Sequence, residues 1–427
     1  MRLVQSTCAL LTLAVLASAA NALAQPAPDV PPAEAERAPE SAPASPPAPA
    51  PPAPPLAAPV AADAPPLMVR PAPPPLKLEN ADASLKLGVL FQPQYEMAGS
   101  PTLSGVSHNF FVRRVRFLVA ATLFKNVEFF MDTDYADLFK AAPDTGAKNT
   151  PGLNVQDAFG TFKALGDALK VDMGYMLPPS THNAVQGAGT LYSWDYFTNS
   201  FRNSNAFNSS GAPVGRDAGV QLRGLLLDNH LEYRAGLFQG RRNAATADGK
   251  ASATNFFRFA ARLQVNVLDA ETGFFYAGTY HGNKKVLSFG ATVDLQDDYV
   301  HFGGDAFLDH PLGPGVFTAQ VNFAHYDGKM FLVNNAVPPV PVLPKQTSVM
   351  AEAGYLIDAI DLSPIARFEY QSVSPTSTHE SRFGGGVAFW PYGHAFNVKA
   401  FYLRVKPDAP GQHGFNQINL QTQVYVF

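Results

Sequence analysis

The chain has 427 residues, of which 15% are charged and 46% are hydrophobic, and its formal net charge at pH 7 is −4. This composition is too apolar and aromatic for a disordered chain and too poor in charge for an ordinary soluble surface. The weakly acidic balance gives no reason to expect nucleic acid as a partner.

The N-terminus has the pattern of a secretory signal peptide. Arg2 precedes an apolar stretch over residues 9–19, and residues 22–24 (Ala-Leu-Ala) offer an A-x-A cleavage site. We therefore expect residues 1–24 to be removed. Cys8 is the only cysteine and lies in this peptide, so no disulfide is expected. No later stretch is apolar for long enough to form a transmembrane helix.

Residues 25–80 are rich in proline and alanine. Such a segment cannot bury a core and is typical of a disordered, extended linker. We expect it to lie in the periplasm. It is either a plain spacer or an anchor that contacts the cell wall or a partner.

A hairpin over residues 109–135 introduces the pattern that the rest of the chain repeats. Alternate side chains of a strand point to opposite faces. By that rule Phe111 and other apolar side chains share one face, with Arg113 as the charged exception. Arg114 and Arg116 share the other face. A membrane barrel would turn its apolar face to lipid and its charged face to the lumen.

Segments of about ten residues with the same alternation continue to the C-terminus, which is the length expected of membrane barrel strands. We predict strands at 84–97, 109–121, 127–138, 153–162, 168–176, 214–226, 230–239, 256–267, 271–280, 286–294, 299–308, 315–326, 346–357, 362–372, 382–390, 395–405 and 415–427, with a weaker candidate at 330–334. Even strand numbers are the rule in bacterial barrels, so we expect 16–18 strands.

Short and long breaks between these segments alternate, as they do between periplasmic turns and extracellular loops. The chain also ends on Val-Tyr-Val-Phe, which resembles an outer-membrane assembly signal. The sequence therefore predicts an all-β fold over residues 84–427, namely a transmembrane antiparallel β-barrel. Its location would be the outer membrane of a Gram-negative cell, with membrane lipid around it. A secreted, soluble all-β protein is the alternative.

The longest break, residues 177–213, is aromatic and comes after the fifth predicted strand. Its candidate functional residues are His182, Trp194, Asp195, Tyr196 and Arg202. Long ordered loops are usually functional. We predict that this one folds into the barrel as a constriction loop, with an extracellular cap as the alternative.

Basic side chains on the predicted lumen face are the candidate pore-lining and anion-binding residues. By parity these are Arg114, Arg116, Arg223, Arg234, Arg258, Arg262, Arg367, Arg382 and Lys399. Arginine or lysine rings select anions, and the guanidinium fork suits phosphate and carboxylate. Arg114 and Arg116 fall roughly opposite Asp134 and Asp132, so this quartet also fits a purely structural charge ladder. The arginines of the predicted strands over 214–267 have fewer evident partners, of which Glu232 is one.

The stretch FFVRRVRFLVAATLFKNVEFFMDTDY resembles the Phe-x-x-Arg-Arg-x-Arg region of the phosphate-selective porin O/P family. Residues 154–159 (NVQDAF) and 170–178 (KVDMGYMLP) are similar to the next segments of that family. The resemblance covers about residues 85–427 and implies a homotrimeric, sixteen-stranded anion channel lined by arginine and lysine. Arg113, Arg114 and Arg116 match the motif. The chain departs from the family in having no Arg-x-Arg-x-Arg run and no lysine in its longest loop.

These observations predict a porin for small hydrophilic, preferably anionic, solutes, with phosphate or other oxyanions among them. A barrel tethered to the cell wall, with incidental or no transport, is the alternative. No metal, dinucleotide or phosphate-loop motif is present, so no cofactor is expected. Ser180 and His182 could suggest a hydrolase, but near neighbours on one loop rarely form a catalytic set, so we expect no enzyme.

Overall fold

A computed structural model describes residues 74–142, 145–196, 215–240, 257–327, 345–374 and 376–427. The expected signal peptide, most of the expected linker, Arg202 and the weak strand candidate at 330–334 lie outside these residues. Among the residues that are described, no helix is long and apolar enough to cross a membrane.

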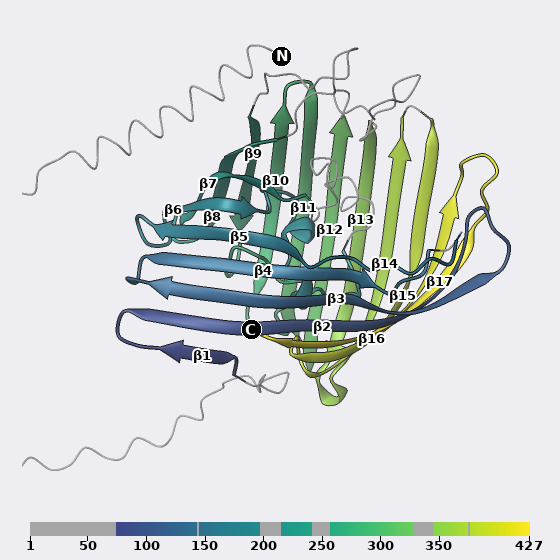
Figure 1. Cartoon of the computed structure of the whole chain (residues 1–427), viewed down its shortest axis with the longest axis horizontal. Helices are drawn as coiled ribbons and strands as arrows, with labels where there is room; N and C mark the ends of the chain where they lie inside the picture. Colours follow the sequence, from purple (N-terminus) through teal and green to yellow (C-terminus); the bar gives the residue numbers. More distant parts are fainter. Residues whose placement is uncertain (1–73, 143–144, 197–214, 241–256, 328–344, 375) are drawn as a thin grey trace, which may run out of the picture. The chain divides into compact units, whose positions relative to one another are not determined.

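The described chain forms one antiparallel sheet of 17 strands (Figure 1). Sixteen of them, β2 to β17, pair in chain order, and β17 pairs back with β2, which closes a barrel. The strands are β1 (Leu76–Glu79), β2 (Ala83–Gly99), β3 (Val106–Leu123), β4 (Val127–Leu138), β5 (Asn154–Lys163), β6 (Lys170–Met176), β7 (Asp217–Leu226), β8 (Leu231–Phe238), β9 (Arg258–Asn266), β10 (Val286–Gln296), β11 (Tyr299–Leu312), β12 (Gly315–Asp327), β13 (Gln346–Ile357), β14 (Leu362–Val373), β15 (Thr378–Tyr392), β16 (Phe396–Pro407) and β17 (Phe415–Val426). The predicted transmembrane-type barrel fold is confirmed, with sixteen strands in the ring.

The extra strand, β1, lies in the range that the sequence predicts to be linker. Leu76 to Glu79 pair with Leu87 to Ser84 of β2. β17 pairs with the next part of β2, which begins at Val89. β1 therefore continues the edge of β2 where β17 stops, and it adds no member to the closed ring.

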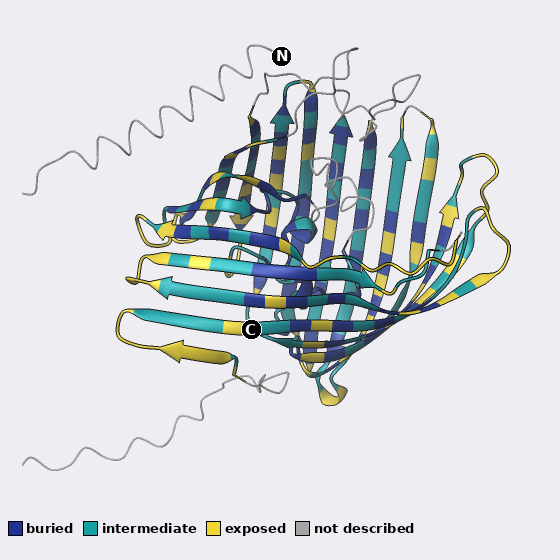
Figure 2. Cartoon of the chain, viewed as in Figure 1, coloured by how far each residue is buried: buried dark blue, intermediate teal, exposed yellow. Residues whose placement is uncertain are grey.

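The two faces of the barrel have inverted polarity compared with a soluble protein. In β9, Arg258, Arg262 and Gln264 are buried, whereas Leu263 and Val265 are exposed. The same banding of buried and exposed residues runs along the other strands (Figure 2). Outward apolar side chains with polar ones inside are what a membrane-spanning barrel requires.

A β-bulge shifts the face assignment early in β3. Gln92 pairs with Arg114 but Pro93 pairs with Val112, so Arg113 is the extra residue. In the part of β3 that precedes Arg113, each side chain therefore points to the face opposite the one that simple alternation predicts. Phe111 therefore points inward and is 5% exposed, and its predicted place on the outer face is wrong. The bulge also explains how two consecutive residues, Arg113 and Arg114, can both reach Asp195 inside the barrel.

The predicted strand at 271–280 is absent, and the predicted tight break at 268–270 is wrong. Residues 267–285 instead form one long connection between β9 and β10. Most other connections at that end are short, such as residues 124–126 between β3 and β4 and residues 313–314 between β11 and β12. The long connection folds into the barrel, where Tyr276 forms a backbone bridge to Gln186.

Candidate functional site

The first segment inside the barrel is residues 177–196, which we call the constriction segment. It contains two short 3-10 helices, His182–Val185 and Ala188–Thr190. His182 has no exposed surface, and Trp194 and Tyr196 are each 5% exposed. The predicted inward fold of this loop is confirmed for the residues described.

Two basic side chains of the wall hold the constriction segment by its backbone. Arg367 of β14 donates to the carbonyl oxygens of Asp195 at 2.7 Å and Tyr196 at 2.6 Å. Lys399 of β16 donates to the carbonyl oxygens of Leu191 at 2.7 Å and Ser193 at 3.0 Å. Both cations therefore satisfy peptide groups that would otherwise be buried without partners.

Aromatic packing supports the same contact. Tyr192 stacks on Trp390 with ring centroids 6.3 Å apart, and Trp194 packs on Phe401 at 5.0 Å. The Arg367 guanidinium carbon lies 4.8 Å from the Trp194 ring centre. The segment is thereby fixed against the β12–β16 side of the barrel.

Asp195 connects the other side of the segment to β3. Its carboxylate accepts from Arg113 Nε at 2.9 Å and from Arg114 Nη2 at 2.6 Å. Burial alone would raise the pKa of Asp195, but the two guanidinium groups outweigh it and hold that pKa well below its usual range. The carboxylate is therefore charged at neutral pH.

The second inward segment is the β9–β10 connection, which we call the inserted turn (residues 267–285). It enters from the opposite end of the strands and pairs with the constriction segment through a parallel bridge, Gln186 with Tyr276. Tyr276 N donates to Val185 O at 3.1 Å, and Gly187 N donates to Tyr276 O at 2.9 Å. Two segments that come from the two ends of the barrel thus meet through backbone hydrogen bonds.

Buried side chains reinforce this meeting point. His182 Nε2 lies 2.9 Å from Glu271 Oε2, and Gln186 Nε2 lies 3.0 Å from His182 Nδ1. Tyr280 Oη donates to Glu271 Oε1 at 2.7 Å. Burial opposes the charge of Glu271, but the His182 and Tyr280 contacts prevail and lower its pKa.

The predicted pore arginines do point inward, but each one that the structure describes has a carboxylate partner. The pairs are Arg114–Asp195, Arg116–Asp132 and Asp134, Arg223–Asp172, Arg234–Glu232, Arg258–Asp294 and Asp217, Arg262–Asp305, Arg367–Glu352 and Glu369, and Arg382–Glu380. The structure thus brings the predicted basic residues together with acidic ones rather than into a purely basic wall.

The expected charge ladder of the β3–β4 hairpin differs in detail. Arg116 takes both aspartates, with 3.2 Å to Asp132 and 3.0 Å to Asp134. Arg114 reaches Asp195 of the constriction segment instead. In the register of β3 and β4, Val115 pairs with Tyr135 and Leu118 pairs with Asp132, so the Arg116 guanidinium lies within reach of both Asp132 and Asp134.

The expectation that Arg258 and Arg262 have few evident partners is wrong. Arg262 is 1% exposed and forms a fork on Asp305, with distances of 2.6 and 2.8 Å. Arg258 forms a similar fork on Asp294. Bidentate pairs of this kind are the strong form of the arginine–carboxylate contact.

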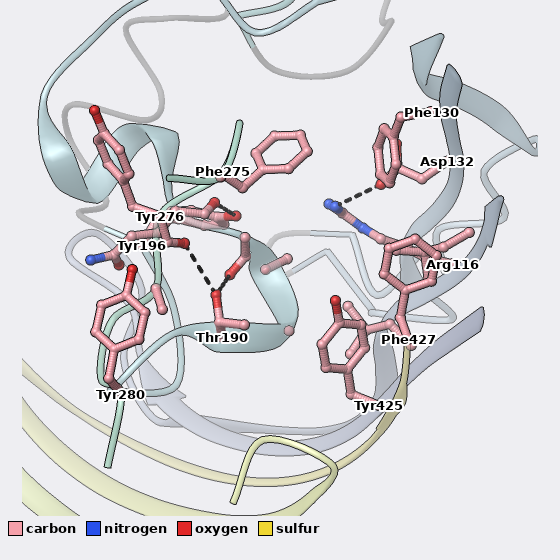
Figure 3. Close-up of a pocket in the computed structure, with 18 of the residues that line it drawn as sticks. Arg116, Phe130, Asp132, Thr190, Tyr196, Phe275, Tyr276, Tyr280, Tyr425 and Phe427 are labelled. Carbon is pink, nitrogen blue, oxygen red and sulfur yellow. Dashed lines mark hydrogen bonds and ion pairs between the residues drawn. The ribbon is translucent and has the colours of Figure 1, made fainter. Parts of the chain in front are cut away.

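A cavity of about 290 Å³ lies where the two inward segments face β2–β4 and the C-terminus (Figure 3). Its wall includes Arg116 and Asp132, already paired, together with aromatic side chains such as Phe130, Phe275 and Tyr425. We call it the lumen cavity. No cluster of histidine, cysteine or carboxylate groups that could hold a metal ion occurs among the described residues.

Solved structures with similar folds are outer-membrane proteins. The anion-selective porin from Comamonas acidovorans is 11% identical, covers 81% of this chain and 100% of its own, and has a TM-score of 0.54. OmpF of Salmonella typhi, solved with daunomycin, is 11% identical over 82% of this chain and 100% of its own, with a TM-score of 0.52. The outer-membrane channel DcaP of Acinetobacter baumannii is 11% identical over 83% and 100%, with a TM-score of 0.50.

These similarities show that the chain has the barrel fold of outer-membrane porins and channels. At such low identity they show the fold alone. No family model matches the chain, and no curated protein matches it.

Sequence reasoning missed the inserted turn. Its key residues are Glu271, Phe275, Tyr276 and Tyr280, which the alternation assigns to a strand. One signal was present, because residues 273–276 read Gly-Phe-Phe-Tyr. Three consecutive aromatic residues break the alternation of a strand with one lipid face.

Proposed function

We propose that this protein is an outer-membrane porin that forms a channel for small hydrophilic solutes. The inverted polarity of the closed barrel carries this proposal, because apolar residues face outward and charged residues face inward along the same strands. Barrels with 16–18 strands are wide enough to leave an aqueous channel. The expected signal peptide, residues 1–24, supports export to that membrane.

The channel is proposed to prefer anions weakly. Arg113 and Arg114 both contact Asp195, and Arg113 also pairs with Asp137 at 3.4 Å, so this group of charges is balanced. Lys399 bonds to carbonyl oxygens and has no ion pair among the described residues. The pairing of the other arginines limits the preference. Phosphate and other oxyanions are candidate solutes because the guanidinium fork matches their geometry.

The homotrimer implied by the resemblance to the phosphate-selective porin O/P family stays a prediction, as does contact of the proline-rich segment with the cell wall. Chemical cross-linking of the purified protein in mild detergent measures the oligomeric state. Co-sedimentation of the full chain with purified cell wall measures the contact with the cell wall.

The channel proposal is tested by the zero-current potential of the purified full-length protein in a planar bilayer under a KCl gradient. A conducting pore with a potential of the sign set by chloride supports the proposal. A conducting pore that prefers potassium overturns the anion preference but leaves the porin. A barrel that inserts without conducting overturns the channel and favours a structural outer-membrane barrel.

A further inference from the structure

We propose that the lumen cavity binds a single-ring aromatic carboxylate, of which benzoate is the simplest example. This inference rests on the proposed channel function, because the cavity lies inside the barrel between the two inward segments. It names a class of solute that composition and parity do not suggest. Three properties of the cavity carry it: its size, its aromatic wall and its one unneutralised cation.

The size of the cavity suits one ring with one small polar group. Its volume is about 290 Å³. An apolar cavity of roughly 150 Å³ holds benzene, and pockets for drug-sized ligands have volumes from about 300 Å³ upward. The cavity is therefore too large for a simple ion and too small for a multi-ring compound or a sugar chain.

The aromatic wall comes from three separate parts of the chain. Phe130 of β4 makes an edge-on contact with Phe275 of the inserted turn, with ring centroids 5.6 Å apart at 63°. It makes a second one with the C-terminal Phe427, at 5.9 Å and 73°. Figure 3 shows Phe130 beside the cavity with Phe427 below it, and Phe275 on the neighbouring inserted turn.

Such a wall discriminates between solutes. Edge-to-face and offset stacking stabilise an aromatic ligand beyond the burial of its surface. An inorganic ion gains nothing from it and loses hydration. The wall therefore favours a ligand with an aromatic ring. The charged groups on the wall determine which polar group that ring carries.

Lys284 of the inserted turn favours a carboxylate as the polar group of the ligand. Of the other charged groups on the cavity wall, Arg116 and Asp132 neutralise each other, and Arg216 is paired with Asp157. Lys284 Nζ donates only to the carbonyl oxygen of Ala270, at 3.0 Å, and has no carboxylate within ion-pair distance among the described residues. A bound carboxylate would provide the missing counter-charge.

Tyr425 adds a hydrogen-bonding group to the same wall. No hydrogen bond to its hydroxyl is found within the described part of the chain, and its ring packs flat on the backbone of the constriction segment. A Cβ atom at Gly189 would lie 2.8 Å from that ring, so only glycine allows this approach. The hydroxyl is free to donate to a ligand oxygen.

The test is isothermal titration calorimetry of the full-length protein in detergent, with benzoate, cyclohexanecarboxylate and acetate as probes and protein-free micelles as the blank. We expect saturable binding of benzoate, weaker binding of cyclohexanecarboxylate and none of acetate. Phe275→Leu should weaken benzoate binding by roughly two- to tenfold, the factor for one aromatic contact. Lys284→Gln should also weaken it.

Both substitutions lie in the inserted turn and not in a barrel strand, so the barrel should still form, which heat-modifiability on a gel verifies. Phe302→Leu, on the outer face at 46% exposure, is the matched control and should bind benzoate like the unaltered protein. Two results would overturn the proposed site. One is an affinity for acetate equal to that for benzoate, and the other is an affinity for benzoate that Phe275→Leu leaves unchanged.

Conductance of the same preparation separates this inference from the channel proposal. A protein that conducts KCl but gives no saturable heat with benzoate is a porin without the proposed site. A protein that binds benzoate but does not conduct keeps the site and loses the channel. Saturable binding together with benzoate-dependent block of the KCl current supports both.

Discussion

His182 and Glu271 join the two inward segments through a buried contact, with His182 Nε2 at 2.9 and 3.1 Å from the two carboxylate oxygens. The histidine ring also stacks between Tyr276 and Phe307, at centroid distances of 4.8 and 4.2 Å. A constriction loop that contacts only the barrel wall narrows a pore from one side. In this barrel the inserted turn, which enters from the opposite end, also contacts the constriction segment and holds it in place.

The first prediction concerns this contact. Glu271→Ala removes the acceptor of both His182 and Tyr280. The attachment of the inserted turn should weaken by about 1.5–3 kcal/mol, the range for a hydrogen bond to a charged group. We expect a larger single-channel conductance, because the turn then spends more time away from the constriction segment. Planar-bilayer recording measures it.

Asp269→Ala is the control for that experiment. Asp269 lies in the same connection, but its carboxylate only accepts from Lys285 N at the exposed base of the turn. Its conductance should match that of the unaltered protein. Equal conductance of Glu271→Ala and Asp269→Ala would show that the His182–Glu271 contact does not set the width of the channel.

The second prediction is that acid loosens the inserted turn. His281 of this turn packs on His394, with ring centroids 4.6 Å apart, beside Trp390 and Lys399. Burial lowers the pKa of His394 to about 4; the carbonyl of Thr279 opposes this shift and the charge of Lys399 adds to it. Burial also lowers the pKa of His281.

A histidine whose pKa is lowered in the folded state is neutral there and gains a proton on release. Its stabilising contribution is therefore complete above about pH 6.5, the ordinary histidine pKa, and is lost as pH falls toward 4. We expect conductance to rise between pH 7 and pH 5. Glu271 should contribute only at lower pH, because its pKa is itself lowered.

The double substitution His281→Gln and His394→Gln tests the assignment. Glutamine can still donate to the Thr279 carbonyl, which His394 Nε2 does at 2.9 Å, but it does not titrate. The rise in conductance between pH 7 and pH 5 should disappear in this variant. A rise of the same size would place the pH response elsewhere in the barrel.

The third prediction concerns the buried arginine forks. Arg258→Ala leaves Asp294 without its bidentate partner inside the barrel. Removing one member of a buried pair typically costs about 3–5 kcal/mol. We expect a lower unfolding temperature of the barrel in detergent, measured by heat-modifiability. Simultaneous Asp294→Asn should restore part of the loss, because it removes one of the two buried carboxylates, Asp294 and Asp217, that lose their ion pair with Arg258.

Arg404→Ala serves as its control, since Arg404 only hydrogen-bonds Asn416 at an exposed position. It should shift the unfolding temperature much less than Arg258→Ala. Similar shifts would mean that the buried fork adds nothing to stability beyond a surface arginine.

The sequence predicts the strands well because a membrane barrel needs one simple alternation. Arg258, Arg262 and Gln264 face inward in β9 while Leu263 and Val265 face outward, as parity requires. The bulge at Arg113 could not be predicted, because the extra residue leaves no mark in composition. It reverses the face of Phe111 and shows how far a parity rule extends.

The candidate site was predicted only in part. His182, Trp194, Asp195 and Tyr196 could be found because they share one long aromatic loop. Their partners could not, since the His182–Glu271 contact joins residues 89 positions apart and depends on a connection that folds inward. The sequence indicated the pairing of Arg116 with Asp132 and Asp134 across their hairpin, but it did not indicate the partners of Arg258 and Arg262. Parity gives the face of a side chain but not its neighbour.

The fourth prediction separates charge selectivity from structure. Lys399 is the cation at the constriction segment that bonds to backbone carbonyls, and it is 1% exposed. Lys399→Met keeps the length of the side chain and removes its charge. If the local field sets the proposed anion preference, the zero-current potential under a KCl gradient should move toward zero.

Lys406→Met is the control on the same strand, because Lys406 lies over the Phe383 ring and is exposed. A change in potential that is equal in both variants would reflect overall charge. No change in Lys399→Met would mean that Lys399 acts only as an anchor for the carbonyls of Leu191 and Ser193.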